Sequence, residues 1–245
     1  MSELGEILKE RTSEIIEYLD FMDHLERNAR VGHNHFSGII RPSPTQMHVL
    51  LSNLYMQLYN LVEGIVSKCI EYLITELIKT PSPSPRRLSR QIRREWIKWK
   101  AKTDTILGSS KRFDIINDLC DYIINDIPIG SFGINISTEG NLCDQKIKSL
   151  FHRIGCEYNV PNDVYRKIKH PISDGDGVLA FLVKRRNALS HGNITFGECG
   201  KDKTTSDLRD IAIRVFEYLA CIVDNFDAYM ESKLYLDENI KRNRT

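Results

Sequence analysis

Residues 43–79, SPTQMHVLLSNLYMQLYNLVEGIVSKCIEYLITELIK, carry the strongest helical signal in the 245-residue sequence and decide its fold class. Ser43, Pro44 and Gln46 form the pattern of a helix N-terminus. Serine can cap the helix, proline fits its first turn, and glutamine completes a capping box. Apolar residues then occur on most faces of a predicted helix that is roughly 50 Å long. A helix with this pattern packs against several others, so we expect it at the centre of a helical protein.

Three further segments show apolar residues at helical spacing, and they complete a set of four main helices. The segments are residues 2 to about 30, about 177–190 and about 206–236. Gly192 is well placed to end the third predicted helix. Because strand alternation is scarce, we predict an all-α protein, an up-down bundle of four main helices.

A smaller, mostly helical section is predicted between the second and third main helices. It begins with the proline-punctuated linker TPSPSPRR at residues 80–87. Three of its segments look helical, and IPIGSFGINISTEGN at 127–141 looks like a loop or a short hairpin. We therefore expect a single domain over 1–245, with its core at 1–80 and 172–237, an insertion at 81–171 and a loose tail at 238–245.

The composition is that of an ordinary globular protein, with 41 % hydrophobic and 27 % charged residues and a formal net charge of +1. The six cysteines are scattered, with neither a C-x-x-C pair nor zinc-site spacing. They are expected to be free thiols in a reducing cytosol. The charged first residues are not typical of a signal peptide, and no apolar run approaches a membrane span. We expect a cytoplasmic protein with no membrane contact, no metal site and no cofactor.

The segment KRRNALSHGN at residues 184–193 combines arginines, asparagines, a serine and a histidine between an apolar run and a loop. Arg186 and His191 have the spacing R-x-x-x-x-H. That spacing alone is weak evidence, because the segment from Arg30 to His35 has it too. Context separates the two. The segment from Arg186 to His191 closes an apolar helix, has Asn187 directly after the arginine, and is followed by a glycine and a long helix.

With these features together, the sequence resembles the HEPN superfamily over roughly residues 1–80 and 172–237. HEPN proteins are helical bundles with an R-x(4–6)-H motif near the third core helix. Arg186, Asn187 and His191 match that motif. The resemblance implies a metal-independent ribonuclease of the toxin–antitoxin or antiviral defence kind, acting as a dimer with both motifs in one cleft. Some HEPN toxins have a modified tyrosine two residues after the histidine. Asn193 stands here instead, which puts that mode of regulation in doubt.

The chemistry of RNA cleavage suits these residue types. Histidine exchanges protons near neutral pH, so His191 is the predicted general acid and base. Arginine presents a permanently charged fork of donors to phosphate oxygens, so Arg186 is predicted to bind the scissile phosphate. Asn187 would orient the imidazole or position the phosphate, and Ser190 and Arg185 are adjacent supporting candidates.

Helix geometry constrains this motif. Positions five apart differ by about 140° around an ideal helix, so Arg186 and His191 would not point the same way. Two explanations stay open. The helix ends before His191, as Gly192 suggests, or the site is composite and two subunits contribute to it.

Glu63 and Tyr59 lie one turn apart in the central apolar helix and are supporting candidates. A buried carboxylate at this position must be paired. One interpretation is that Glu63 holds Arg186 or His191 in place. The other is that it faces water or pairs with a structural lysine.

Residues 86–102, RRLSRQIRREWIKWKAK, contain eight basic residues and one acid. Such a segment could follow an RNA backbone and stack bases on its tryptophans. The alternative is an amphipathic helix whose tryptophans pack in the core. The candidate RNA-binding residues are Arg90, Arg93, Arg94, Trp96, Lys98 and Trp99.

The sequence thus predicts a metal-independent endoribonuclease that cleaves RNA by attack of the 2′-hydroxyl. A homodimer, or a heterodimer with a second HEPN-like subunit, is expected, together with an antitoxin or defence partner. The alternative is a non-catalytic binding or dimerisation module, or a subunit of a larger defence complex.

Overall fold

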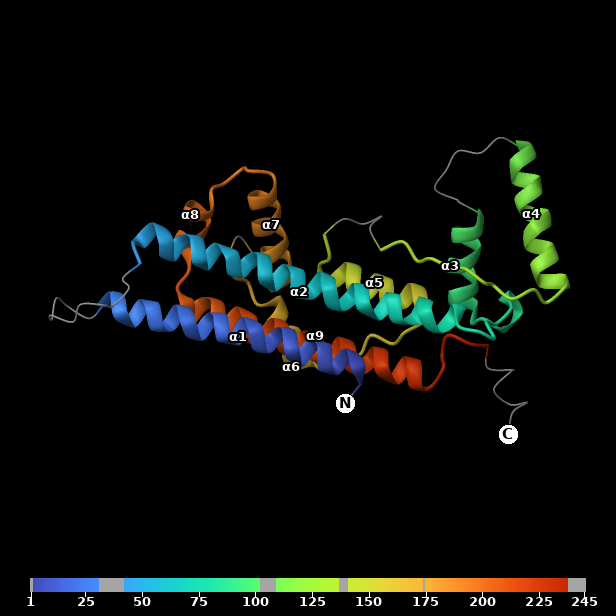
Figure 1. The fold of residues 1–245 in the computed structure, drawn as a ribbon, viewed down its shortest axis with the longest axis horizontal. Coiled ribbons are helices and arrows are strands. Elements are labelled where there is room, and N and C mark those ends of the chain that lie inside the picture. The colour runs from blue at the N-terminus through green and yellow to red at the C-terminus, as the bar shows by residue number, and fades with distance from the viewer. Residues whose placement is uncertain (1, 31–41, 102–108, 137–140, 174, 238–245) are drawn as a thin grey trace. The chain divides into compact units, whose positions relative to one another are not determined.

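A computed structural model describes residues 2–30, 42–101, 109–136, 141–173 and 175–237 (Figure 1). Within these ranges the secondary structure is helical, with isolated bridges such as Leu88 to Leu236 and no strands. The predicted all-α class is therefore confirmed. The helices are α1 (Glu3–Arg30), α2 (Pro44–Ile78), η1 (Pro85–Arg87), α3 (Arg90–Ala101), α4 (Ser109–Ile124), α5 (Asp144–Ile154), α6 (Asn162–Lys169), α7 (Val178–Ser190), α8 (Phe196–Cys199), η3 (Gly200–Asp202) and α9 (Thr205–Glu231).

The chain divides into two compact units, which are described one at a time. The first unit comprises residues 1–65, 142–144 and 160–221, and the second comprises 66–141, 145–159 and 222–245. Both α2 and α9 contribute to each unit. These boundaries differ from the predicted core and insertion, and the single domain over 1–245 stays a prediction. The predicted tail and the segment from Val31 to His35 lie outside the described residues.

The N-terminus of α2 carries the predicted capping box. The backbone N–H of Ser43 donates to Oε1 of Gln46 at 2.7 Å, and the N–H of Gln46 donates to Oγ of Ser43 at 3.2 Å. These two bonds satisfy donors that the first helical turn leaves without partners. The central helix therefore begins where its sequence predicts.

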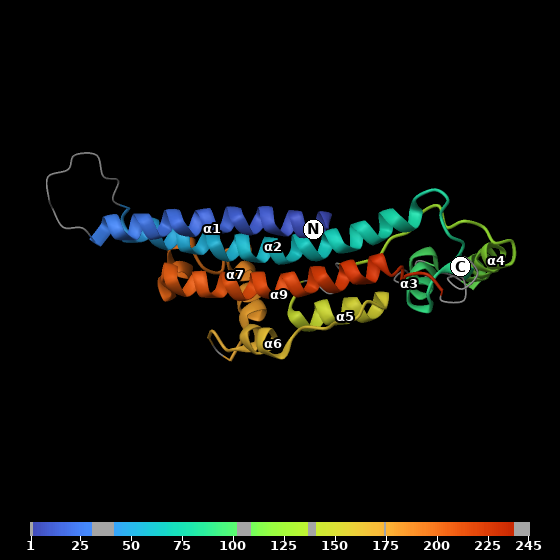
Figure 2. The same ribbon diagram turned by 90° about the horizontal axis from the view of Figure 1, so that it is seen from below.

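In the first unit, α1 lies beside the first parts of α2 and α9 (Figures 1 and 2). The Tyr18 hydroxyl of α1 donates to the Leu50 carbonyl of α2 at 2.9 Å. Arg209 of α9 donates to Asp20 at 2.7 Å and to Asp23 at 2.6 Å, both on α1. These polar contacts border a buried apolar interface, which supplies most of the stabilisation.

Helix α7 runs crosswise to α2 (Figure 1), and most of its buried residues lie in its N-terminal half, at Val178, Leu179, Phe181 and Leu182. The ring of Phe181 meets the ring of Tyr55 edge to face, with centroids 5.4 Å apart. This contact fixes α7 on the surface of α2, and so places the end of α7 relative to the central helix.

The chain forms a short helical segment after α7 that apolar periodicity did not predict. Helix α8 begins with a capping box between Thr195 and Glu198, and η3 follows directly. Gly200 packs so closely on α2 that a Cβ atom there would lie 1.9 Å from the carbonyl oxygen of His48. A helix this short has no detectable periodicity, so only the packing on α2 reveals it.

The second unit contains η1, α3, α4, most of α5 and the ends of α2 and α9. Its most buried carboxylate, Glu95, accepts hydrogen bonds from Arg153 at 2.6 Å and from Lys98 at 2.7 Å. Burial alone would raise the pKa of Glu95. The two cationic partners outweigh that effect and hold the pKa below its usual range.

In the second unit, residues 127–136 form a loop, which is one of the two alternatives predicted for 127–141, and 137–140 lie outside the described residues. The end of α9 differs from expectation. Helix α9 ends at Glu231 rather than near 236, because Lys233 adopts a left-handed φ of 50°. Since left-handed ends usually carry glycine or asparagine, a lysine gives no sequence signal for this ending.

None of the helices among the described residues has an apolar stretch long enough to cross a membrane.

The close approach of Gly200 to α2 gives a stability test. We expect Gly200→Ala to lower the free energy of unfolding by about 2 kcal/mol, because the added methyl group overlaps backbone atoms that cannot move independently. Gly197→Ala is the matched control, since its Cβ would lie 3.6 Å from the Thr45 side chain. It should stay within about 0.5 kcal/mol of wild type in urea unfolding. Equal stabilities of the two variants would contradict this packing.

Candidate functional site

Helix α7 ends in a glycine-based C-terminal motif that includes the predicted histidine. Gly192 has a left-handed φ of 69°. Its N–H donates to the Leu189 carbonyl at 3.1 Å, and the N–H of Asn193 donates to the Ala188 carbonyl at 2.9 Å. These two bonds form a Schellman motif, which satisfies carbonyls at the helix end. The prediction that Gly192 ends this helix is confirmed.

His191 is the C-cap of α7, with φ −91° and ψ 0°. It has therefore left the regular helix, and its side chain is exposed. Among the described residues, the imidazole makes no hydrogen bond or ion pair. The ring is thus open to a ligand or another chain.

Arg186 lies one turn earlier, against α2. Its guanidinium carbon is 4.8 Å from the centroid of the Tyr59 ring. Its Nη1 donates to Oδ1 of Asn187 at 3.1 Å. A guanidinium stacked on an aromatic face keeps its N–H groups directed to the sides, where phosphate oxygens can accept from them. The structure thus brings together three of the predicted residues, namely Arg186, Asn187 and Tyr59.

Tyr59 is 2 % exposed, and its buried ring supports the guanidinium of Arg186. Burial raises the pKa of its hydroxyl, and the charge of Glu63 raises that pKa further. A backbone hydrogen bond with Leu142 and the nearby charge of Arg186 act in the opposite direction. Tyr59 is therefore a neutral phenol, with its ring face toward the guanidinium.

Glu63 is half-buried one turn further along α2. Within the described part of the chain, no ion pair joins it to Arg186 or His191. Its negative charge affects this site by raising the pKa of the Tyr59 hydroxyl. Neither of the two interpretations for Glu63 is established.

Arg185 and Ser190 differ from Arg186 in their surroundings. Arg185 donates to Asp202 of η3 at 2.6 Å, and its guanidinium carbon lies 5.1 Å from the Phe181 ring centroid. These contacts attach α7 to the segment that follows it. The contacts of Arg185 are therefore those of a structural residue. Ser190 is exposed at the last helical position, next to His191.

The basic segment of the second unit divides into packed and exposed residues. Trp96 is 1 % exposed and packs near Tyr122, with ring centroids 5.4 Å apart, which matches the packing alternative. Arg93 donates to the carbonyls of Pro85 and Leu88, each at 2.8 Å, and Lys98 pairs with Glu95. The candidates left exposed on α3 are Arg90, Arg94 and Trp99.

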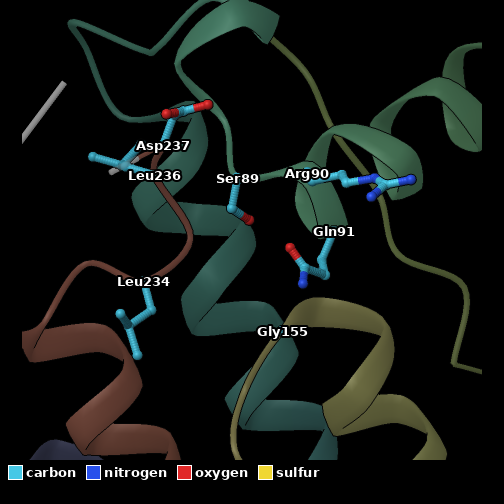
Figure 3. Close-up of a pocket in the computed structure, with 7 residues that line it drawn as sticks. All are labelled: Ser89, Arg90, Gln91, Gly155, Leu234, Leu236 and Asp237. Atoms are coloured by element: carbon cyan, nitrogen blue, oxygen red, sulfur yellow. The ribbon is translucent and has the colours of Figure 1, made fainter. Parts of the chain in front are cut away.

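Arg90 also lines a cavity of about 370 Å³ at the start of α3. Figure 3 shows the other residues around it, Ser89, Gln91, Gly155, Leu234, Leu236 and Asp237. The Arg90 side chain is turned away from Leu234 and Asp237 in that view. This cavity belongs to the second unit, whereas Arg186 and His191 belong to the first.

Sequence reasoning missed the long-range partners of the charged candidates. Asp202 for Arg185, Leu142 for Tyr59 and Arg153 for Glu95 all come from distant parts of the chain. A single sequence carries no local signal for such pairs. Among the described residues, no group of three or more His, Cys, Asp and Glu side chains gathers as a metal site.

Comparison with known proteins identifies the family. Residues 1–235 match the sequence profile described as HEPN_MAE_28990/-like HEPN. Searches among curated proteins and solved structures find no match. The match covers nearly the whole sequence, including the end of α7 with its Arg186-to-His191 motif. The chain therefore belongs to the HEPN_MAE_28990/-like HEPN family.

Proposed function

We propose that this HEPN protein is a metal-independent endoribonuclease whose site lies at the end of α7. HEPN domains are often ribonucleases. The observation that carries the proposal is the arrangement of Arg186, which stacks on Tyr59 and bonds to Asn187, one turn before the exposed His191.

The proposed reaction uses the nucleophile that RNA itself supplies. The 2′-hydroxyl oxygen bonds to the adjacent phosphorus as its proton leaves, and the bond from phosphorus to the 5′-oxygen breaks. The 5′-oxygen takes up a proton. The products are a 2′,3′-cyclic phosphate and a 5′-hydroxyl, so the step needs no water and no redox partner.

Arg186 suits the role of phosphate ligand. Extra negative charge develops on the non-bridging oxygens in the transition state, and a fixed cation there lowers its free energy. Because Tyr59 and Asn187 already hold the guanidinium, less rotational freedom is lost when the phosphate binds.

His191 suits the role of proton donor and acceptor. Its position at the C-cap places the ring at the end of α7, about one turn after Arg186. Its exposure lets an RNA strand reach the ring. Asn187 would then position either the phosphate or the guanidinium that binds it.

We further propose that two copies complete each site. Helix α7 is regular through Ser190, so Arg186 and the C-cap residue leave the helix in different directions. An arginine from one copy and a histidine from the other can converge where the same two residues of one copy do not. The second copy is this chain or another HEPN-like subunit, and an antitoxin or defence partner is part of the same proposal.

The catalytic assignment predicts that His191→Ala lowers the cleavage rate about 100-fold or more, as expected on loss of a general acid or base. The assay follows a fluorescent RNA with purified protein in EDTA and identifies the 2′,3′-cyclic phosphate product. His24→Ala is the matched control, because His24 is also exposed in the first unit. Equal cleavage by wild type and His191→Ala, or activity only with added magnesium, would refute the assignment.

Tyr59 is proposed as a positioning residue. We expect Tyr59→Leu to reduce cleavage about fivefold or more, because the aromatic surface under Arg186 is lost. Tyr59→Phe keeps that surface and should retain most of the activity, although it loses the hydroxyl bond near Leu142. Thermal unfolding of both variants controls for a general loss of stability. If the phenylalanine variant were as inactive as the leucine variant, the ring would not be what matters.

Subunit mixing tests the composite site. Neither Arg186→Ala nor His191→Ala should cleave RNA alone. An equal mixture, unfolded and refolded together, should recover about a quarter of wild-type activity, since half of the dimers carry one intact site. Lack of recovery, with heterodimers shown to be present, would place both residues in one copy. If the wild-type protein does not cleave RNA and Arg186→Ala no longer associates, the alternative of a non-catalytic binding module would be favoured.

A further inference from the structure

Helix α3 in the second unit presents a row of cations to solvent. Arg90, Arg94 and Lys98 follow one another at intervals of four residues, so successive side chains lie about 40° apart around the helix. Arg90 and Arg94 are exposed, and the Lys98 side chain is 41 % exposed. We call these three residues the α3 cation row. The rest of this helix face is uncharged and consists of Gln91, Ile97 and Ala101.

The chain supplies little negative charge to this row. Glu95, the one acid of α3, is 4 % exposed and lies on the buried side of the helix. It accepts a hydrogen bond from Lys98, but Arg153 binds its other carboxylate oxygen at 2.6 Å. Among the residues that the structure describes, no ion pair joins Arg90 or Arg94 to an acid. Two of the three cations in the row are therefore not neutralised within the described chain.

Two neighbouring arginines, by contrast, have acid partners. Arg87 lies 3.8 Å from Asp126, and Arg93 lies 3.4 Å from Asp237. Asp237 also lines the cavity at the start of α3, but the Arg90 side chain is turned away from it (Figure 3). Because like charges one turn apart repel each other, the row destabilises α3 unless a negatively charged ligand binds it.

The residue types and their linear spacing favour a phosphate backbone as that ligand. A guanidinium presents a planar fork of donors that matches phosphate oxygens. A series of cations also suits a chain of phosphates better than a single small anion, since each neutralised phosphate releases counterions.

Trp99 does not belong to the cation row. It lies about 180° from Arg90 around α3 and packs on Phe132, with ring centroids 6.4 Å apart. The row therefore has no aromatic side chain on which a base could stack. Contacts from the row would go to phosphates, which carry no base sequence.

From this arrangement, we propose that the α3 cation row binds the phosphate backbone of an RNA strand, independently of its base sequence. The choice of RNA among polyanions rests on the proposed ribonuclease function. The row belongs to the second unit, whereas Arg186 and His191 belong to the first. Binding through the row is therefore a property separate from cleavage, and each can be tested without the other.

The test measures binding of an RNA that the proposed reaction cannot cleave. The full-length protein is titrated into a fluorescent, single-stranded 2′-O-methyl RNA of about 20 nucleotides, which is longer than a typical single-strand site. This RNA lacks the free 2′-hydroxyl nucleophile, so fluorescence anisotropy reports binding even if the ribonuclease proposal fails. Titrations at several salt concentrations give the slope of log affinity against log salt.

The double variant Arg90→Gln/Arg94→Gln should bind this RNA about tenfold or more weakly at low salt. Its salt slope should fall by about 1.4, because each phosphate contact on a single strand contributes about 0.7. Arg90→Lys/Arg94→Lys keeps both charges and should keep the slope. Unfolding in urea checks that each variant is as stable as wild type.

Lys68→Gln/Lys79→Gln is the matched control. It also removes two positive charges from the second unit, but Lys68 lies 2.8 Å from Glu71 and Lys79 lies 3.8 Å from Glu76. Because acids of the chain already face these lysines, the control should bind RNA within about twofold of wild type.

Four results would overturn the proposal. The first is equal affinity and salt slope for wild type and Arg90→Gln/Arg94→Gln. The second is an equal loss in the lysine control, which would mean that net charge explains the binding. The third is a preference of more than about tenfold between oligo(A) and oligo(U), which would exclude backbone recognition. The fourth is binding of polyglutamate or phosphatidylserine vesicles through the row without binding of RNA.

Discussion

The left-handed residue Gly192 is the constraint on which the candidate site at the end of α7 depends. Its φ of 69° lets the chain close the last turn of α7 and satisfy the carbonyls of Ala188 and Leu189. Before Gly192, α7 is a regular helix that packs on α2. After Gly192, the chain turns toward α8. His191 stands at the boundary, fixed by its backbone and open at its side chain, while Arg186 remains inside the helix and rests on Tyr59.

The neighbouring residues Arg185 and Arg186 show how one helix can carry a structural contact and a candidate functional residue side by side. They project about 100° apart around α7. Arg185 pairs with Asp202, a contact that is partly exposed and contributes less than about 1 kcal/mol. Arg186 lies on a buried aromatic ring, where the attraction is of similar size. The difference is therefore one of placement, since only Arg186 shares its surroundings with Asn187 and the helix end.

In the second unit, the basic residues are divided between packing contacts and the surface. Two residues of the basic segment that looks suited to RNA hold the unit together instead, because Arg93 binds backbone carbonyls and Lys98 neutralises the buried Glu95. Arg90, Arg94 and Trp99 remain on the surface. Helix α4 then presents an apolar face that the chain's own described segments leave uncovered. A net charge of +1 over the whole sequence hides this uneven distribution.

The sequence alone was enough to determine the helical class, the limits of α1, α2 and α7 and the cap at Ser43, because periodicity, capping and glycine stops are local properties. It also identified the Arg186-to-His191 segment and its family. Tertiary structure decided the rest. It showed that Tyr59 supports Arg186, that Arg185 is tied to Asp202, that Trp96 is buried, and that α9 ends early at a left-handed lysine. Each of these depends on contacts or backbone geometry that residue type and spacing do not encode, since the contacting groups meet only after the helices have packed.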